Sequence, residues 1–158
     1  MRGEGAGARA AGVQAMPPPL ILLSLQGEEH AVREALGRLM AALVPLGLTH
    51  DCRETVELVL AEVLNNIVEH AYAEAPGPIE VELRAAADGV GCVICDHGRP
   101  MPDGTPPLGR QTLLDVPLED LPEGGFGWFL IRSLTRDLDY VRQRGSNRLS
   151  FLIPIAQG

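Results

Sequence analysis

Hydrophobic positions recur at two spacings along this chain, and the spacing separates expected helices from expected strands. Between Glu28 and Leu46 the apolar residues fall three or four apart, which indicates an amphipathic helix; they are Val32, Leu36, Leu39, Met40 and Leu43. A second helix is expected from Thr49 or Asp51, either of which can cap it, to about Ala73. Its apolar stripe consists of Val56, Val59, Leu60, Val63, Leu64, Ile67 and Ala71.

Shorter segments show the alternation, or the short apolar run, of β-strands. The strands expected from it cover residues 20–25, 79–86, 90–95, 138–142 and 148–155. Asp88-Gly89 and Gly145-Ser146-Asn147 would turn the two hairpins, and a third helix would follow the glycines at 124–127 and end near Arg136. This order lacks regular βαβ alternation and predicts an α+β domain, a mixed sheet with helices on one face.

Composition excludes several protein classes. Residues 1–19 are rich in Gly, Ala, Arg and Pro without a period, so we expect a disordered lead before one domain at 20–158. The apolar run at 20–25 is too short for a membrane span or a secretory signal, and we expect a cytoplasmic protein. The formal net charge of −8 disfavours binding to nucleic acid.

All 13 basic residues are arginine. The absence of lysine excludes a Walker A loop, a eukaryotic-type protein kinase and Schiff-base chemistry, each of which needs a lysine. Cys92 and Cys95 have a spacing found in metal and redox sites, but no second cysteine pair exists to complete a zinc site. On a strand, a spacing of three places the two thiols on opposite faces, so we interpret both as strand residues.

A polar stripe crosses the second expected helix. Glu62, Asn66 and His70 recur every four residues and therefore share a face, with Asn65 and Glu69 beside them. A solvated helix face would give the same pattern. Two adjacent asparagines in mid-helix, however, cost stability without an obvious local gain. A carboxylate, an amide and an imidazole on successive turns are suited to Mg²⁺ and to a water or hydroxyl.

Two segments that contain glycine are further candidates. Asp96 ends the strand expected at 90–95, where its carboxylate could accept a hydrogen bond from a base amino group while Gly98 lets a ligand approach the backbone. An ordinary strand-to-turn exit is the alternative. The glycines at 124, 125 and 127 precede a helix and would offer N–H groups to phosphates, although a flexible hinge has the same composition.

In this order and spacing, the three segments resemble the GHKL ATPase superfamily, and most closely its RsbW-type anti-sigma-factor serine kinases. Residues 60–72 (LAEVLNNIVEHAY) match the N box, 96–102 (DHGRPMP) the first glycine box and 124–131 (GGFGWFLI) the second. Residues 145–149 lie where the strand pair of the third box is expected. The resemblance covers roughly residues 20–156 and implies the Bergerat fold, a two-layer sandwich with a mixed, mostly antiparallel sheet.

The resemblance implies a role for each matched residue. Glu62 would be the general base that takes the proton of an attacking hydroxyl, and Asn66 would bind Mg²⁺. Asp96 would bind the adenine amino group, and Gly98 would line the adenine pocket. The full ATP-binding set implied by the resemblance is Asn66, His70, Asp96, Gly98, Pro102, Gly125, Phe126 and Gly127.

Residues 103–124 would then form a lid over ATP. Because lysine is absent, Mg²⁺, backbone N–H groups and Arg110 of the lid would offset the phosphate charge, unless Arg110 is a solvated loop residue. Two departures from the family bear on catalysis. Pro100 stands where the first glycine box usually has a second glycine, and the lid is rich in proline and in acidic residues. Kinase activity therefore follows less directly than nucleotide binding.

The resemblance implies a serine/threonine kinase that phosphorylates a STAS-type anti-sigma antagonist, sequesters a sigma factor and forms a homodimer. A catalytically weak module that captures a partner in a nucleotide-dependent way is the second possibility; the retained Glu62 favours the kinase, because a pure binder needs no base. A detached histidine-kinase catalytic domain is a third, disfavoured because His30 lies in too short a helix to be a phosphoacceptor. An α+β domain without a nucleotide is the fourth.

Overall fold

The computed structural model describes residues 17–109 and 126–155. Its strands are β1 (Ile21–Gln26), β2 (Pro78–Ala86), β3 (Gly89–Asp96), β4 (Arg136–Gln143) and β5 (Ser146–Pro154). Its α-helices are α1 (Glu29–Ala42), α2 (His50–Asn66) and α3 (Phe126–Leu134), with short 3-10 helices at Val44–Leu46 and Pro102–Gly104 and a π-helical turn at Ile67–Ala71. None of the helices in this part of the chain has the length and apolar character that crossing a bilayer requires.

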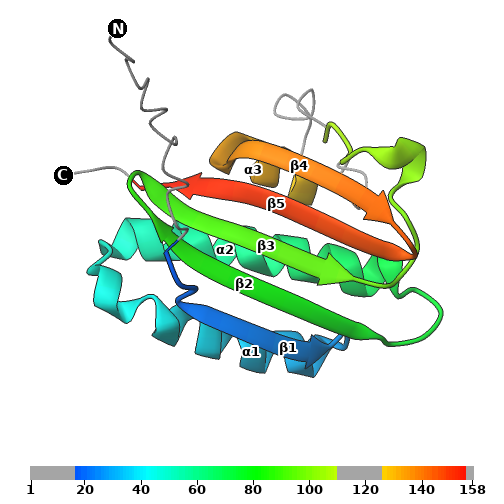
Figure 1. Ribbon diagram of the computed structural model, residues 1–158, viewed down its shortest axis with the longest axis horizontal. Coiled ribbons are helices and arrows are strands. Elements are labelled where there is room, and N and C mark those ends of the chain that lie inside the picture. Colours follow the sequence, from blue (N-terminus) through cyan, green and yellow to red (C-terminus); the bar gives the residue numbers. More distant parts are fainter. Residues whose placement is uncertain (1–16, 110–125, 156–158) are drawn as a thin grey trace, which may run out of the picture.

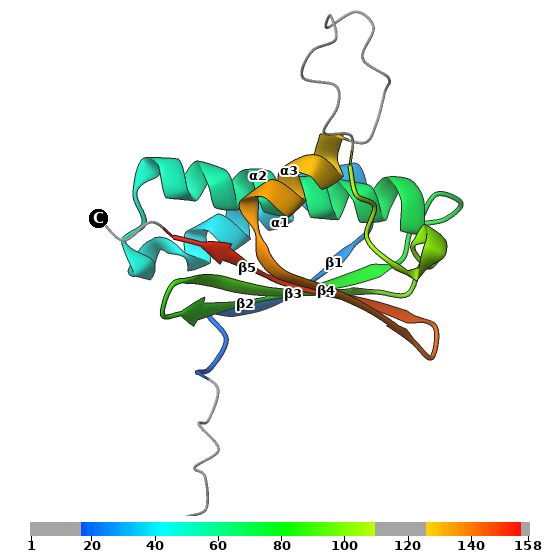
Figure 2. The same cartoon turned by 90° about the horizontal axis from the view of Figure 1, so that it is seen from above.

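The strands form one five-stranded sheet in the order β1-β2-β3-β5-β4, and every pairing in it is antiparallel. The three helices cover one face of this sheet, so that the domain has two layers (Figures 1 and 2). The expected α+β architecture with helices on one face is confirmed. The register places Asp96 opposite Asn147, and Asn147 opposite Arg142, at one end of the sheet.

The core lies between the helices and the covered face of the sheet. Every second residue of β2, β3 and β5 points into it, and the expected apolar stripe of α2 is buried from Val56 to Leu64. Fully burying a side chain such as Leu60 or Leu64 stabilises the fold by roughly 1.5–3 kcal/mol. Because the apolar and polar faces belong to one rigid helix, burying the apolar face also fixes the direction of the polar face of α2.

The second helix begins as expected and ends differently. Thr49 is its N-cap and accepts a hydrogen bond from the Cys52 N–H at 3.2 Å, which satisfies a free donor of the first turn. Regular α-helix ends at Asn66 rather than near Ala73, because the Tyr72 N–H bonds to the Ile67 carbonyl, five residues back. This single π-helical turn is a feature that recurs at functional sites.

Two turns and one helix end differ from the sequence prediction. The β4–β5 hairpin turns at Arg144 and Gly145, both with positive φ (51° and 77°), so Ser146 and Asn147 belong to β5. The β2–β3 hairpin turns at residues 87 and 88, and Gly89 already pairs in β3. The third helix ends at Leu134, and the chain enters β4 at Arg136.

Candidate functional site

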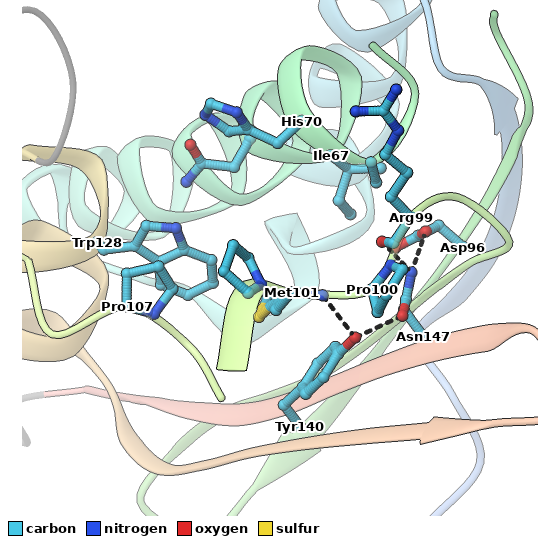
Figure 3. Close-up of a pocket in the computed structure, with 13 residues that line it drawn as sticks. Ile67, His70, Asp96, Arg99, Pro100, Met101, Pro107, Trp128, Tyr140 and Asn147 are labelled. Atoms are coloured by element: carbon cyan, nitrogen blue, oxygen red, sulfur yellow. Dashed lines mark hydrogen bonds between the residues drawn. The ribbon is translucent and has the colours of Figure 1, made fainter. Parts of the chain in front are cut away.

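A cavity of about 430 Å³ opens at the end of the sheet where β3 leaves it. Figure 3 shows its wall, which comes from the π-helical turn, the loop after β3, α3 and strands β4 and β5. The lining residues are Asn66, Ile67, His70, Ala71, Asp96, Arg99, Pro100, Met101, Pro102, Pro107, Trp128, Tyr140 and Asn147. A cavity of this size, mostly apolar with a few converging polar groups, is typical of a small-molecule site.

Asp96 supplies a buried carboxylate to this cavity. The residue is only 5% exposed, and its Oδ1 accepts hydrogen bonds from the Gly98 N–H and the Asn147 Nδ2, both at 2.8 Å. Oδ2 receives no hydrogen bond from the described residues. One oxygen therefore fixes the orientation of the carboxylate, and the other is an acceptor available to a ligand.

Asn147 is the polar centre that joins the loop after β3 to the β4–β5 hairpin. Its Nδ2 donates to Asp96 and also to the carbonyls of Gly98 at 3.3 Å and Arg99 at 2.9 Å. Its Oδ1 accepts from the Tyr140 hydroxyl at 2.5 Å and from Arg142 Nη1 at 2.9 Å. The residue is 4% exposed, and this complete set of partners is what permits a buried amide.

Gly98 has a structural reason to be glycine. A Cβ there would lie 2.4 Å from the Ala71 carbonyl oxygen, so the loop can pack against the π-helical turn only without a side chain. The Arg99 N–H bonds to the same carbonyl at 2.9 Å. Contrary to the expectation, Gly98 is not among the described residues that line the cavity; its neighbours Arg99 and Pro100 are.

Glu62, Asn66 and Gly127 come together where α3 begins. A Cβ on Gly127 would lie 2.6 Å from Glu62 Oε2 and 3.4 Å from Asn66 Nδ2, so both side chains reach the backbone of the first turn of α3. The free N–H groups and dipole of a helix N-terminus favour an anion at this place. The polar stripe on α2 is therefore directed at α3 and is not a solvated helix face at these two positions.

The Asn66 amide carries an unsatisfied donor. Its Nδ2 is buried and has no hydrogen-bond partner among the described residues. A phosphate oxygen would satisfy it, and the amide oxygen is of the kind that Mg²⁺ accepts alongside phosphates and water. The described residues contain no cluster of three or more His, Cys, Asp or Glu that could hold a metal by themselves. The Asn66 amide thus has a donor that suits a phosphate and an oxygen that suits Mg²⁺.

The remaining expected site residues are distributed over the cavity and its edge. His70 and Pro102 line it, whereas Phe126 is the half-buried first residue of α3. Gly125, Arg110 and most of the expected lid lie outside the described residues. The described start of that segment is anchored to α3, because Arg132 donates to the carbonyls of Pro106 at 2.6 Å and Pro107 at 2.7 Å.

Several lining residues were missing from the sequence prediction. Tyr140 and Trp128 form an apolar part of the cavity wall. Trp128, the one tryptophan of the chain, lies across the cavity from Asp96 (Figure 3). The Tyr140 hydroxyl also accepts the Met101 N–H at 3.0 Å. Asn147 could have been found from the period of two in β5, since it alternates with the apolar residues Leu149 and Phe151.

Tyr72 fastens the loop after β3 from behind. Its hydroxyl donates to the Pro78 carbonyl at 2.6 Å and accepts the His97 N–H at 2.8 Å. Burial raises the pKa of Tyr72, the His97 N–H lowers it, and the nearby Asp96 carboxylate raises it further. The hydroxyl is therefore protonated and able to donate at neutral pH.

The two cysteines of β3 point to opposite faces, as expected. Cys92 is buried in the core, and burial raises the pKa of its thiol. Cys95 is partly exposed on the other face; burial raises the pKa of its thiol, the Arg148 charge lowers it, and nearby carboxylates raise it. Neither thiol lies in the cavity.

Known proteins are similar to much of this chain. The family model described as Histidine kinase-like ATPase domain matches residues 25–153. A relative named Serine-protein kinase RsbW from Bacillus mycoides (strain KBAB4) is 29% identical over 102 residues, which are 63% of this chain and 63% of the relative. A relative of the same name from Bacillus cereus (strain AH187) is 30% identical over 101 residues, 63% of this chain and 62% of the relative. The match thus spans less than two thirds of either relative.

A solved structure shares the fold. The crystal structure of the RsbU and RsbW domains of Rv1364c from Mycobacterium tuberculosis aligns with a TM-score of 0.60 and 19% identity, over 90% of this chain and 34% of that one. At this identity the likeness establishes the fold alone. The family model covers most of the chain, including α2, α3 and all of β2 to β4. The chain therefore belongs to the histidine kinase-like ATPase domain family.

Proposed function

We propose that this domain binds Mg·ATP in the cavity and transfers the γ-phosphate to a serine or threonine of a STAS-type anti-sigma antagonist. One observation carries the proposal: Asn66 of α2 and Asp96 of β3 line one cavity, and Glu62 meets the first turn of α3 beside Asn66. The same fold thus holds an acceptor for the adenine amino group, Asp96, and a carboxylate beside the proposed phosphate site, Glu62.

In this proposal Asp96 Oδ2 accepts the adenine amino group, since Oδ1 is already engaged. The phosphates reach the N-terminus of α3, where Asn66 Nδ2 gains an acceptor. Asn66 Oδ1 would hold Mg²⁺, which neutralises developing phosphate charge when bound. Gly125, Phe126 and Gly127 would offer backbone N–H groups, and Arg110 with the rest of residues 103–124 would close over the nucleotide.

Glu62 is the proposed general base. The substrate hydroxyl oxygen attacks the γ-phosphorus, the bond to the β–γ bridging oxygen breaks, ADP leaves and Glu62 takes the hydroxyl proton. Its carboxylate lies against the backbone of α3 at Gly127, and this position beside the proposed phosphate site supports the assignment. A base with that position has no evident purpose in a domain that only captures a partner.

The partners are proposed from the relatives. The relatives are named serine-protein kinases RsbW, and the solved structure joins an RsbW domain to an RsbU domain. By analogy, this chain would sequester a sigma factor and act as a homodimer in the cytoplasm, where ATP is available. Residues 1–19 would be a lead outside the kinase domain of residues 20–158.

The test is transfer of radiolabelled phosphate from ATP to a purified STAS-type antagonist. Glu62→Gln should leave the affinity for Mg·ATP within about twofold and reduce the transfer rate by roughly 10²–10⁴-fold. Glu57→Gln is the matched control, because Glu57 is exposed on the same helix. No transfer by the unaltered protein, with nucleotide binding intact, would replace the kinase with a nucleotide-dependent binding module.

A further inference from the structure

A second groove adjoins the nucleotide cavity. It has a volume of about 470 Å³ and lies between the turn at residues 72–76 and the loop at 97–100, with Arg142 of β4 at its side. We call it the rim groove. It shares Ala71, Arg99 and Pro100 with the nucleotide cavity, so the same loop forms part of both walls.

The rim groove concentrates cationic groups in a chain of net charge −8. Arg99 and Arg142 line it together with His97, and Glu74 is the one carboxylate among its described lining residues. Glu74 forms an ion pair with Arg99, but the two side chains are 80% and 57% exposed. Such an exposed pair is weak and leaves the groove attractive to a further anion.

Arg142 offers a free recognition edge to this groove. Its Nη1 donates to the Gly98 carbonyl at 2.6 Å and to Asn147 Oδ1 at 2.9 Å, which fixes the plane of the guanidinium. Nε and Nη2, which form the opposite donor edge, have no partner among the described residues. This edge matches two carboxylate oxygens, and the two inner bonds reduce the entropy lost on binding.

The surroundings favour a protein segment over nucleic acid. Ala75, Pro76 and Pro100 give the rim groove small apolar surfaces beside the arginines, a combination that suits side chains next to a carboxylate. The overall negative charge of the chain would repel the continuous phosphate charge of a nucleic acid. A short acidic stretch meets only the local positive field.

We propose that the rim groove binds an acidic segment of a protein partner through Arg142, and that its occupancy changes the affinity of the nucleotide cavity. Arg142 contacts Asn147, and Asn147 holds the Asp96 oxygen that fixes the carboxylate. A carboxylate bound at the outer edge partly neutralises the guanidinium charge and thereby weakens the inner bonds of Arg142 to Asn147 and Gly98. The coupling rests on the proposed ATP binding, whereas docking in the groove does not.

The probe is a fluorescein-labelled peptide of six Glu-Ser repeats, titrated with the full chain at low ionic strength and followed by anisotropy. Binding is expected, and Arg142→Gln should weaken it about tenfold or more, the value of a charge-assisted hydrogen bond pair. Arg148→Gln removes the same charge from an exposed position of β5 outside the groove and should cost less than about twofold. Thermal unfolding of both variants verifies that they fold.

Three further titrations distinguish an acidic protein segment from other ligands. A peptide of six Gln-Ser repeats should not bind, free glutamate at the same carboxylate concentration should not compete, and a 12-nucleotide single strand should bind more weakly than the acidic peptide. Equal losses in Arg142→Gln and Arg148→Gln, or tighter binding of the oligonucleotide, would overturn the docking proposal. Competition by free glutamate would likewise replace the partner segment with a small anion.

The coupling is measured as the Kd for Mg·ATP with and without saturating Glu-Ser peptide. A change of about fivefold or more is expected, and the peptide affinity must change by the same factor when ATP saturates the protein. Arg142→Lys, which keeps a donor for Gly98 but loses the two-donor edge, should abolish the coupling and keep ATP binding. An unchanged Kd would overturn the coupling, while absence of any ATP binding would contradict the proposed function and leave the docking result standing.

Discussion

Replacing Gly127 by alanine separates the stability of the fold from the chemistry of the site. A Cβ at this position would lie 2.6 Å from Glu62 Oε2, so the carboxylate must retreat by about 0.8 Å to reach an ordinary contact of 3.4 Å. The obstructing atom is the end of a flexible side chain. The backbone of α3 can therefore keep its place while the proposed base moves.

The two consequences have opposite signs. Alanine in a helix is favoured over glycine by up to about 1 kcal/mol, so the free energy of unfolding should stay within about 1 kcal/mol of the unaltered protein or rise. A displacement of the base by nearly 1 Å should reduce phosphoryl transfer by about 10²-fold. Affinity for Mg·ATP should fall less than the transfer rate, since Asp96 and its partners are untouched.

The assay pairs urea unfolding with phosphate transfer to a STAS-type antagonist. Gly37→Ala is the matched control, because Gly37 is an exposed glycine within α1 and a Cβ there meets no atom within 4 Å. It should raise stability and leave transfer unchanged. Full transfer activity in Gly127→Ala would refute the placement of Glu62 as the base.

Two further predictions concern buried groups. Asn147→Ala removes the donor to Asp96, Gly98 and Arg99 and should lower the free energy of unfolding by about 1–3 kcal/mol and weaken nucleotide binding; unchanged urea unfolding would show that the amide is dispensable. Burial raises the pKa of the Cys92 thiol, so the folded protein keeps the thiol protonated at a pH where the unfolded chain loses the proton. The free energy of unfolding should therefore fall as pH rises above the unfolded-state pKa of about 8.5, by about 2 kcal/mol at pH 10. Urea titrations at pH 8 and pH 10 should therefore show a smaller pH-dependent loss in Cys92→Ala, and an identical loss in both proteins would contradict the burial effect.

Local patterns were sufficient to predict the framework of this domain. The apolar stripe of α2 and the alternation in β2 depend on residues close in sequence, and the structure confirms both. Of the two caps expected for α2, Thr49 and Asp51, the structure has Thr49. The structure also places Glu62 and Asn66 on one face of α2, as their spacing of four predicts.

The errors lie where distant segments decide the local conformation. The π-helical turn that follows α2 was not predicted; the Ala71 carbonyl at its end bonds to Arg99, 28 positions along the chain, and Gly98 packs against it. The β4–β5 turn was wrong because Asn147 pairs with Asp96 of β3 and is drawn into the strand. No local signal contains either partner.

The central claim is that the cavity holding Asp96 binds ATP, and calorimetric titration with Mg·ATP tests it most directly. The unaltered protein should bind with micromolar Kd, and Asp96→Asn should lose about tenfold or more, because the amide that replaces Oδ2 cannot accept the adenine amino group. Asp139→Asn, on an exposed position of β4, should bind as the unaltered protein does. Equal affinity in the Asp96 and Asp139 variants, or no binding by the folded unaltered protein, would contradict the account.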